Sequence, residues 1–314
     1  MSKKVDIIIV NWNSGNLLLE CVESILNTND LNKNISNILV VDNNSNDNSI
    51  ALIEKYKPHI IIINNNINIG FGKACNIGSK FSNSEYILFL NPDTRILDNS
   101  LLKGVTFLDK NSDIFVLGCL QYGIGNKIIH SCANLPNFFT SFNWLSGLSK
   151  INNRLFPDFH LNKFDYNKSN FVEHVMGSFY LIRRKIFMNL SGFDEDYFVY
   201  QEDTDLSKRI SHLGQNRIFY NSEIKIYHES GGTSKNILGK RIYYSINALL
   251  IYAKKHFKTH EYYLIKLFVI FITPFPRLIF SISKLSYKDV KSFFVAYYYL
   301  YQSILKNLFK KFIF

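Results

Sequence analysis

Acidic residues cluster in one short stretch of this chain. Six of its 25 acidic residues fall within the thirteen positions from Phe193 to Asp205. Like charges this close destabilise a fold unless a cation, a metal ion or a proton-transfer role offsets them. Another carboxylate, Asp93, follows the apolar segment Tyr86–Leu90 in the sequence Asn91-Pro92-Asp93. Two acidic sites far apart in the sequence suggest metal-assisted chemistry on a phosphate-bearing substrate.

The Asn91-Pro92-Asp93 segment supports two interpretations. A carboxylate at the end of a strand can hold Mg²⁺ or Mn²⁺ against a diphosphate, because hard cations prefer oxygen ligands. The same three residues are also good turn formers. The residue types alone leave both interpretations open.

Asp203 and His228 also have two interpretations each. Asp203 could be a general base that takes a proton from an acceptor hydroxyl. Aspartate is equally a favoured helix N-cap, and Asp205 with Arg209 has the spacing of a helical ion pair. Capping and catalysis are compatible, so the placement does not exclude the role. His228 follows a predicted strand, where an imidazole could complete a metal site or simply be solvated or hydrogen-bonded.

A glycine-containing segment, Asn68–Gly78, begins another predicted helix. Gly70 and Gly72 at its start could hold a phosphate through backbone N–H groups. The segment is not a dinucleotide-binding fingerprint, because Cys75 stands where the third glycine of that motif is required. Phe71 and the helix after it could instead be core packing.

The first hundred residues alternate between short apolar segments and one-sided apolar stripes. The periodicity predicts strands over residues 5–10, 38–41, 60–63 and 86–90, and helices over about 17–26, 49–56 and 68–81. Asn13 or Ser14 could cap the first helix. The alternation predicts an α/β fold with right-handed βαβ units and a mostly parallel sheet. Ligands bind at the carboxyl ends of such strands, where Asp42 and Asp93 lie.

The second half of the chain is less regular. Residues 121–170 show weak periodicity and are predicted to form loops and short elements around the pocket of a second ligand. Regular structure is predicted again over residues 172–184, in a helix from about residue 203, and in a half-exposed strand over 223–227. No internal repeat is present.

Composition bounds the class of protein. With 314 residues and 47% hydrophobic residues, the chain can form one large α/β domain or two smaller ones. Its four cysteines form no C-x-x-C pair, so reduced thiols in a cytosolic protein are expected. The apolar run near the N-terminus is too short for a signal peptide and predicts a first strand.

Most of the positive charge lies in the C-terminal region. Residues 250–314 hold 11 Lys and Arg residues and two acidic residues, a net charge of +9. The whole chain has a net charge of +11. The apolar run from Leu267 to Pro276 is shorter than the roughly 20 residues that a bilayer span needs. Aromatic residues mixed with lysine predict helices that lie in the membrane interface. Nucleic-acid binding is not expected, since the basic residues are interleaved with much aliphatic surface.

Taken together and in order, these segments resemble family 2 glycosyltransferases with the GT-A fold, especially bacterial rhamnosyltransferase-like members. The resemblance covers residues 5 to about 260. The segments that carry it are Val5–Asn13, Val40–Asp47, Asn68–Gly78, Leu90–Thr94, Gly177–Arg184, Gly192–Glu195, Glu202–Leu206, His228 and the pair Lys255-His256.

The resemblance implies roles for individual residues. Asp42 matches an aspartate that binds the base or ribose, and Asp93 matches the metal ligand of the family's D-x-D motif. Asn91 replaces the first carboxylate of that motif, which weakens the hold on the metal. Asp203 matches the catalytic base, and His228 matches a histidine that helps bind the metal in some relatives. The remaining donor contacts implied are Asn11, Asn68, Gly70, Lys73, Asn76 and Asn91.

The expected protein is therefore an inverting glycosyltransferase that uses Mg²⁺ or Mn²⁺. Residues 1–235 would form the GT-A catalytic domain, with a nucleotide-binding half over 1–110 and an acceptor-binding half over 111–235. Residues 236–314 would form a helical, membrane-interface region. The first choice of donor is dTDP-rhamnose, and the second is a UDP-hexose. The expected acceptor is a lipid-linked oligosaccharide or another saccharide at the inner face of the cell membrane.

Two other classes of protein were weighed against this expectation. A nucleotidyltransferase should have a basic, glycine-rich phosphate loop near the first strand, and residues 11–16 contain no Lys or Arg. A non-catalytic, membrane-associated binder of nucleotide sugars would not need Asp203.

Overall fold

The computed structural model describes residues 4–28, 34–231, 237–283 and 286–312. The chain divides into two compact units. Unit 1 contains Met1–Leu135, His160–Phe198 and Glu202–Thr233, and unit 2 contains Pro136–Phe159, Val199–Gln201 and Ser234–Phe314. The boundary predicted at residue 235 lies outside the described residues. Residues 136–159, which were predicted to belong to the acceptor-binding half, are part of unit 2.

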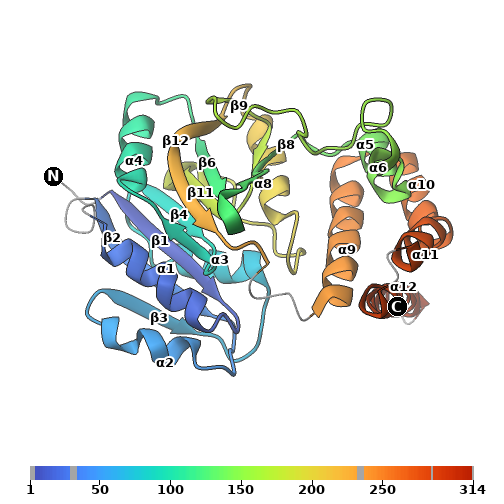
Figure 1. Ribbon diagram of the computed structural model, residues 1–314, viewed down its shortest axis with the longest axis horizontal. Coiled ribbons are helices and arrows are strands. Elements are labelled where there is room, and N and C mark those ends of the chain that lie inside the picture. The colour runs from blue at the N-terminus through green and yellow to red at the C-terminus, as the bar shows by residue number, and fades with distance from the viewer. Residues whose placement is uncertain (1–3, 29–33, 232–236, 284–285, 313–314) are drawn as a thin grey trace. The chain divides into compact units, whose positions relative to one another are not determined.

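Unit 1 is built on one large sheet with the strand order β3-β2-β1-β4-β11-β6-β12-β5 (Figure 1). Its strands are β1 (Val5–Asn11), β2 (Ile35–Asp42), β3 (Ile60–Asn64), β4 (Tyr86–Leu90), β5 (Thr94–Ile96), β6 (Val116–Tyr122), β11 (Phe179–Arg183) and β12 (Ile218–His228), with β7 (Ile128–Ile129) beside β6 and β9 (Asn170–Phe171) beside β12. A separate small sheet pairs β8 (Cys132–Ala133) with β10 (His174–Val175).

The sheet is parallel in its first part and mixed beyond it. β3, β2, β1 and β4 run parallel, as the alternating pattern predicted. β11 then pairs antiparallel with both β4 and β6, while β12 runs parallel to β6. Because β11 is antiparallel, its first residue, Phe179, lies opposite Leu90 at the end of β4. The beginning of β11 therefore reaches the edge where the parallel strands end.

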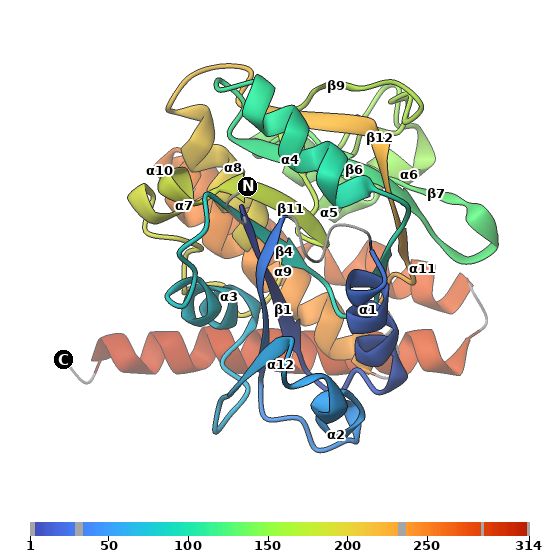
Figure 2. The same ribbon diagram turned by 90° about the vertical axis from the view of Figure 1, so that its left-hand side faces the viewer.

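Helices cover both faces of this sheet, as Figure 2 shows for α1 and α3. Along β1 the side chains alternate, so that Ile7 and Ile9 pack into one core and Ile8 and Val10 into the other. The first core includes α1 (Asn16–Leu26), α2 (Ser49–Ile53) and α4 (Ser100–Lys110); the second includes α3 (Phe71–Ser79), α7 (Arg184–Asn189) and α8 (Glu202–Ser211). Short 3₁₀ helices, η1 (Glu54–Tyr56) and η2 (Ile124–Asn126), complete the unit.

The predicted cap of the first helix was wrong. The N-cap of α1 is Gly15, which makes no side-chain capping bond. Asn13 lies before it with φ 50°, and its Oδ1 accepts a hydrogen bond from the N–H of Asn46. Gly15 donates its own N–H to Asp47. Side chains of the polar loop after β2 thus fix the start of α1, and a local capping rule does not include that loop.

Unit 2 is helical and has its own core. It contains α5 (Phe138–Ser146), α6 (Leu148–Ile151), α9 (Leu238–His256), α10 (Thr259–Phe271), α11 (Pro274–Ser283) and α12 (Tyr287–Phe312). Leu145 of α5 is buried with apolar residues of α9, α10 and α12. α5 was missed in the sequence, although Asn137 and Thr140 form a capping box at its start. Its apolar partners lie a hundred or more residues later, so local periodicity gave a weak signal.

The described helices include none that could cross a membrane alone. α10 and α11 reach the required length and apolarity as a pair, bent by 44° at the break between them.

Gly70 supplies a test of how α3 is held in unit 1. It has φ 90°, and a Cβ atom there would lie 2.3 Å from the carbonyl oxygen of Phe198. Phe71 donates its N–H to the same oxygen at 2.8 Å. We expect Gly70→Ala to lower the free energy of unfolding by about 3 kcal/mol or more, because strain and a backbone clash add together. Chemical denaturation monitored by circular dichroism measures the change.

Gly125→Ala is the matched control. Gly125 has φ 69°, but a Cβ atom there would meet nothing within 4 Å. The expected loss is therefore about 1 kcal/mol, from backbone strain alone. Equal losses in the two variants would contradict the close packing of Gly70 against Phe198.

Candidate active site

The ends of β1 and β2 carry a buried polar group. Asn11, the last residue of β1, lies opposite Asp42, the last residue of β2. Asn11 Nδ2 donates to Asp42 Oδ1 at 2.7 Å and to Ser49 Oγ at 2.9 Å. Asp42 also accepts from Ser45, through its N–H at 2.9 Å and its Oγ at 2.6 Å. Asn11 Oδ1 is buried and has no hydrogen-bond partner among the described residues, so it is an acceptor that a ligand could satisfy.

The loop before α3 is tied to the same edge of the sheet. Asn43, directly after β2, donates from Nδ2 to the carbonyl oxygen of Gly70 at 3.1 Å. Asn68 Oδ1 accepts the N–H of Gly70 at 3.0 Å. The N–H groups of Gly70 and Phe71 are thus both used within the protein. Both N–H groups already have partners in this structure, and the donor contact expected of Gly70 stays a prediction.

Two other predicted donor contacts, Lys73 and Asn76, face the acidic stretch. The amide of Asn76 bonds both backbone groups of Phe193, accepting its N–H at 2.9 Å and donating to its carbonyl at 2.8 Å. Lys73 Nζ lies 3.9 Å from Glu195 Oε2. These side chains attach α3 to the stretch that begins at Phe193. The structure gives both a positioning role and shows no contact with the ends of β1 and β2.

Asp93 and His228 come together although they are far apart in the sequence. β12 pairs antiparallel with β5 so that His228 lies opposite Thr94. The backbone carbonyl of Asp93 accepts the N–H of Glu229 at 2.9 Å. This register places His228 Nε2 3.3 Å from Asp93 Oδ1, with the two side chains only 5% and 6% exposed. Asn91 joins the site through its main chain, since its N–H donates to the carbonyl of Ser178 at 3.1 Å.

Gln121 fixes the orientation of the His228 ring. Gln121 Oε1 lies 2.9 Å from His228 Nδ1 and also accepts the hydroxyl of Ser178 at 2.9 Å. A carbonyl oxygen accepts, so Nδ1 carries the proton and Nε2 of the neutral ring has a lone pair. That lone pair faces Asp93 Oδ1, and two acceptors at this distance require a proton or a cation between them.

The pair has the chemistry and spacing of two metal ligands. Two atoms that bind one cation in adjacent positions, each at about 2.1 Å, lie roughly 3 Å apart. A ligating histidine commonly donates its other N–H to a carbonyl or carboxylate, as His228 does to Gln121. Within the described ranges, no group of three or more His, Cys, Asp or Glu side chains forms a metal cluster. The described part of the protein therefore offers two metal ligands, Asp93 and His228.

Asp203 lies at the start of α8, but it is not the predicted N-cap. Its Oδ2 accepts the N–H of Gly177 at 2.7 Å, and its Oδ1 accepts the N–H of Thr204 at 2.8 Å. A Cβ atom on Gly177 would lie 3.0 Å from Asp203 Oδ2. His174 Nε2 is 3.8 Å from the same oxygen. Burial lowers the pKa of His174, an effect that the charge of Asp203 opposes.

Gly177 and Ser178 connect Asp203 to the metal-ligand pair. Gly177 holds Asp203 through its N–H, and the next residue holds Asn91 through its carbonyl and Gln121 through its hydroxyl. The backbone just before β11 is therefore bonded to both predicted centres. Gln121, which bonds Ser178, and His174, which faces Asp203, had no recognisable signal in the sequence.

Four of the six carboxyl groups in the acidic stretch have surroundings that limit their mutual repulsion. Asp205 Oδ2 accepts the guanidinium of Arg209 at 2.7 Å, as the helical spacing predicted. Glu195 faces Lys73, and Asp203 accepts two backbone N–H groups. Glu202 is 5% exposed, and its Oε2 has no hydrogen-bond partner among the described residues. Burial, and secondarily the neighbouring Asp203, raises the pKa of Glu202 well above its ordinary value.

Comparisons with known proteins agree with this arrangement. The family model described as glycosyl transferase family 2 matches residues 6–190. The chain is 26% identical over 194 residues to rhamnosyltransferase WbbL of Escherichia coli (strain K12), covering 58% of this chain and 69% of the relative. It is 32% identical over 128 residues to poly(ribitol-phosphate) beta-glucosyltransferase of Bacillus spizizenii, but the match covers 40% of this chain and 20% of that protein. The chain thus spans about a fifth of the length of that relative.

Solved structures share the fold. The mannosyltransferase PcManGT from Pyrobaculum calidifontis, in complex with GDP-Man and Mn²⁺, has a TM-score of 0.58 at 14% identity, with 99% of this chain and 88% of that one covered. Staphylococcus aureus TarS 1–349 in complex with UDP-GlcNAc has a TM-score of 0.54 at 16% identity, covering 93% and 79%. The GT-A fold that the resemblance implied is confirmed. With a family model that covers more than half of its length, this chain belongs to glycosyl transferase family 2 and is a glycosyltransferase.

Proposed function

We propose that this protein transfers a sugar, with inversion, from a nucleotide-sugar donor to a lipid-linked or saccharide acceptor during assembly of a bacterial surface polysaccharide. The observation that carries the proposal is that one segment, Gly177–Ser178, bonds Asp203 directly and reaches the Asp93–His228 site through Asn91 and Gln121. Rhamnose from dTDP-rhamnose is the first choice of donor, since two relatives are named rhamnosyltransferases. A UDP-hexose is the alternative.

The donor would lie along the ends of β1, β2 and β4. Asn11 and Asp42 would bind the base or ribose, with the unsatisfied Asn11 Oδ1 accepting a hydrogen bond. Asp93 and His228 would hold Mg²⁺ or Mn²⁺, with the remaining positions taken by diphosphate oxygens and water, as is usual for such ions at phosphate substrates. A bound cation offsets the negative charge that grows on the leaving diphosphate.

Asp203 is assigned as the general base. It takes the proton from an acceptor hydroxyl, whose oxygen forms a bond to the anomeric carbon while the bond from that carbon to the diphosphate oxygen breaks. Attack from the face opposite the diphosphate inverts the configuration. The N–H groups of Gly177 and Thr204 orient the carboxylate. His174 beside it is kept neutral by burial, so it does not compete as a cation.

Glu202 supports this assignment by its own protonation state. Two adjacent charged carboxylates would repel each other, and burial keeps the proton on Glu202. Asp203 is the member of the pair that is bonded to the Gly177 backbone.

Unit 2 is proposed to rest on the inner face of the cell membrane. Large apolar side chains are exposed along α10 and α11, including Leu267 at 53%, Phe271 at 61%, Phe275 at 67% and Ile279 at 68%. Exposed apolar surface of this kind marks an interaction site, and the nearby lysines favour anionic lipids. A lipid-linked acceptor would be met at that surface.

The catalytic assignment predicts separable defects. We expect Asp203→Asn to bind donor normally but lose about 10²–10⁴-fold in turnover, the usual effect of removing a general base. Asp93→Ala should weaken metal and donor binding together. A screen of sugar nucleotides, read as released nucleoside diphosphate with and without Mn²⁺ or Mg²⁺, measures turnover, and calorimetry measures donor binding.

Asp165→Asn, at an exposed site, is the control. Normal turnover of Asp203→Asn would remove it as the base, and donor binding without turnover in the native protein would favour the non-catalytic binder.

Glu202 predicts a distinctive dependence of stability on pH. Its pKa is raised in the folded protein and is near 4.5 when unfolded, so above pH 4.5 folding takes up a proton. The free energy of unfolding should therefore fall by about 1.4 kcal/mol per pH unit from this group, from pH 4.5 up to the raised pKa. Glu202→Gln should remove this slope, whereas Glu223→Gln at an exposed position should keep it. Urea unfolding at several pH values measures it, and equal slopes in both variants would refute the buried neutral carboxyl.

The membrane proposal predicts loss of binding when apolar contacts are removed. Leu267→Glu with Phe271→Glu should reduce co-sedimentation with phosphatidylglycerol vesicles at least about tenfold, because each buried side chain contributes about 1.5–3 kcal/mol. The control is Phe81→Glu with Ile124→Glu, which changes side chains of unit 1 that are 53% and 64% exposed. Undiminished sedimentation of the Leu267 and Phe271 variant would exclude this surface.

A further inference from the structure

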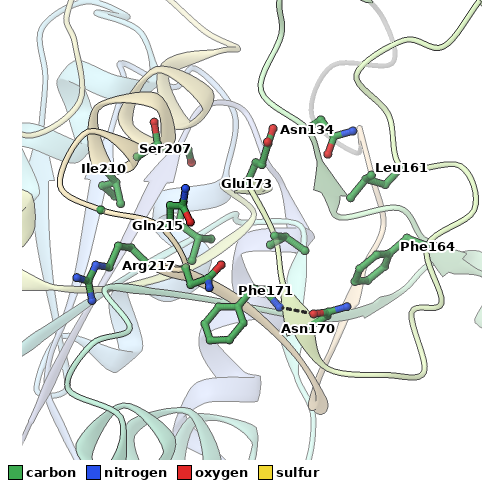
Figure 3. A pocket seen from close by; sticks show the side chains of 15 residues that line it. Asn134, Leu161, Phe164, Asn170, Phe171, Glu173, Ser207, Ile210, Gln215 and Arg217 are labelled. Atoms are coloured by element: carbon green, nitrogen blue, oxygen red, sulfur yellow. Dashed lines mark hydrogen bonds between the residues drawn. The ribbon is translucent and has the colours of Figure 1, made fainter.

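A cavity of about 500 Å³ lies in unit 1, and no residue from the ends of β1, β2 or β4 lines it. Figure 3 shows the side chains around it. It is bordered by the second half of α8, by the turn over residues 214–217, and by the segment that contains β9 and leads to β10. Its volume falls within the range of about 300–1,000 Å³ that is usual for small-molecule sites. None of the residues assigned to the donor, the metal or the base lines it.

Side-chain amides surround the cavity. Asn134, Asn170, Gln215 and Asn216 all line it and all are exposed, and Figure 3 shows three of them with Glu173 around the open space. The side chains of Asn134, Gln215 and Asn216 make no hydrogen bond to the described part of the chain. Each amide has both a donor and an acceptor to offer. Such groups match a ligand rich in hydroxyls, which also donates and accepts.

Apolar side chains form the rest of the lining. Phe164, Phe171, Leu161 and Ile210 belong to it, and Ile210 is fully buried. Phe171 is 44% exposed, although its ring meets that of Phe219 edge to face. A lining with aromatic surface and a few polar groups that fix orientation is typical of small-molecule sites. Sugar rings present both C–H faces and hydroxyl edges, so this mixture suits them.

The charges in the lining balance each other. Arg217 is the cation there: its Nη1 donates to the carbonyl of Asp113 at 3.0 Å and lies 3.3 Å from the Asp113 carboxylate, and its buried Nε has no hydrogen-bond partner among the described residues. Glu173 contributes a carboxylate, which accepts the N–H of Leu135 at 2.7 Å. With one cation, Arg217, and one carboxylate, Glu173, the lining has no net charge that would attract an anion. The lining therefore favours a neutral ligand.

The cavity is close to the assigned base but does not include it. Ser207 lines the cavity and lies one helical turn after Asp203, about 6 Å along α8. The buried ring of His174 bonds Ser207 through Nδ1 at 3.0 Å and faces Asp203 through Nε2 at 3.8 Å. A ligand in the cavity is therefore separated from Asp203 by the His174 ring. Asp203 does not line the cavity, so the hydroxyls of a ligand bound there are not those that Asp203 would deprotonate.

We propose that this cavity binds a neutral sugar unit of the acceptor glycan other than the unit that receives the transferred sugar. The inference rests on the proposed function for the identity of the glycan, and on the lining for the chemical class. A second point of attachment would hold a growing saccharide near the base while its reacting end changes.

The test is a saccharide titration of the full chain by ligand-observed NMR. Methyl α-L-rhamnoside, methyl β-D-glucoside and N-acetylglucosamine are the probes. We expect saturable binding of at least one of them, in the millimolar range typical of so small a ligand. The variant Asn134→Ala, Phe171→Ala, Gln215→Ala should weaken that binding at least about tenfold, because two hydrogen bonds and an apolar contact are lost. Phe81→Ala with Asn83→Ala, both exposed in unit 1 and outside the cavity, is the control.

Asp203→Asn separates the cavity from the catalytic centre. Binding to the cavity should be unchanged in that variant and in the presence of excess uridine or thymidine diphosphate. Donor turnover is read separately as released nucleoside diphosphate, so failure of the proposed function would leave the titration itself unaffected. The proposal is overturned if none of the three probes binds saturably, or if the cavity variant binds them as tightly as the control.

Discussion

The contact between Asp93 and His228 is the constraint on which the rest of the site depends. It joins two residues that are far apart in the sequence, and it exists because β12 runs beside β5 in the register that sets His228 opposite Thr94. A shift of one residue would turn His228 to the other face of the sheet. Gln121, from the neighbouring strand β6, then fixes which ring nitrogen faces the carboxylate. Sheet order, register and tautomer together set Nε2 of His228 against Asp93 Oδ1, where we propose that a cation binds.

The antiparallel strand β11 connects Asp203, the proposed base, to the same region. Parallel strands alone would gather Asn11, Asp42 and Asp93 at one edge, which is enough to bind a nucleotide. Because β11 begins where β4 ends, the residues just before it can bond Asp203 on one side and Asn91 and Gln121 on the other. A side chain at position 177 would crowd the carboxylate of Asp203, because its Cβ atom would lie 3.0 Å from Oδ2. Residues 177 and 178 thus connect Asp203 with the residues beside Asp93 and His228.

The sequence predicted the parts of this molecule that local patterns determine. β4 was predicted with its observed bounds, and the carboxyl-end placement of Asp42 and Asp93 followed from the βαβ pattern. Contacts between distant segments could not be predicted. Asn76 was predicted as a donor contact. Its bond to Phe193 could not be predicted, because that bond depends on how α3 packs. Gln121 and His174 have ordinary local surroundings, and they gain their roles only when β6, β10 and α8 come together. The helix α5 was missed for the same reason.

The most direct test of the account is pulsed electron paramagnetic resonance of Mn²⁺ bound to the full chain in the presence of thymidine or uridine diphosphate. Coordination by His228 Nε2 predicts nitrogen modulation from a single imidazole, together with phosphorus coupling from the diphosphate. The nitrogen signal should vanish in His228→Gln, and the phosphorus coupling should weaken in Asp93→Ala. Bound Mn²⁺ with no imidazole nitrogen, or a nitrogen signal that survives the loss of His228, would contradict the assigned cation site.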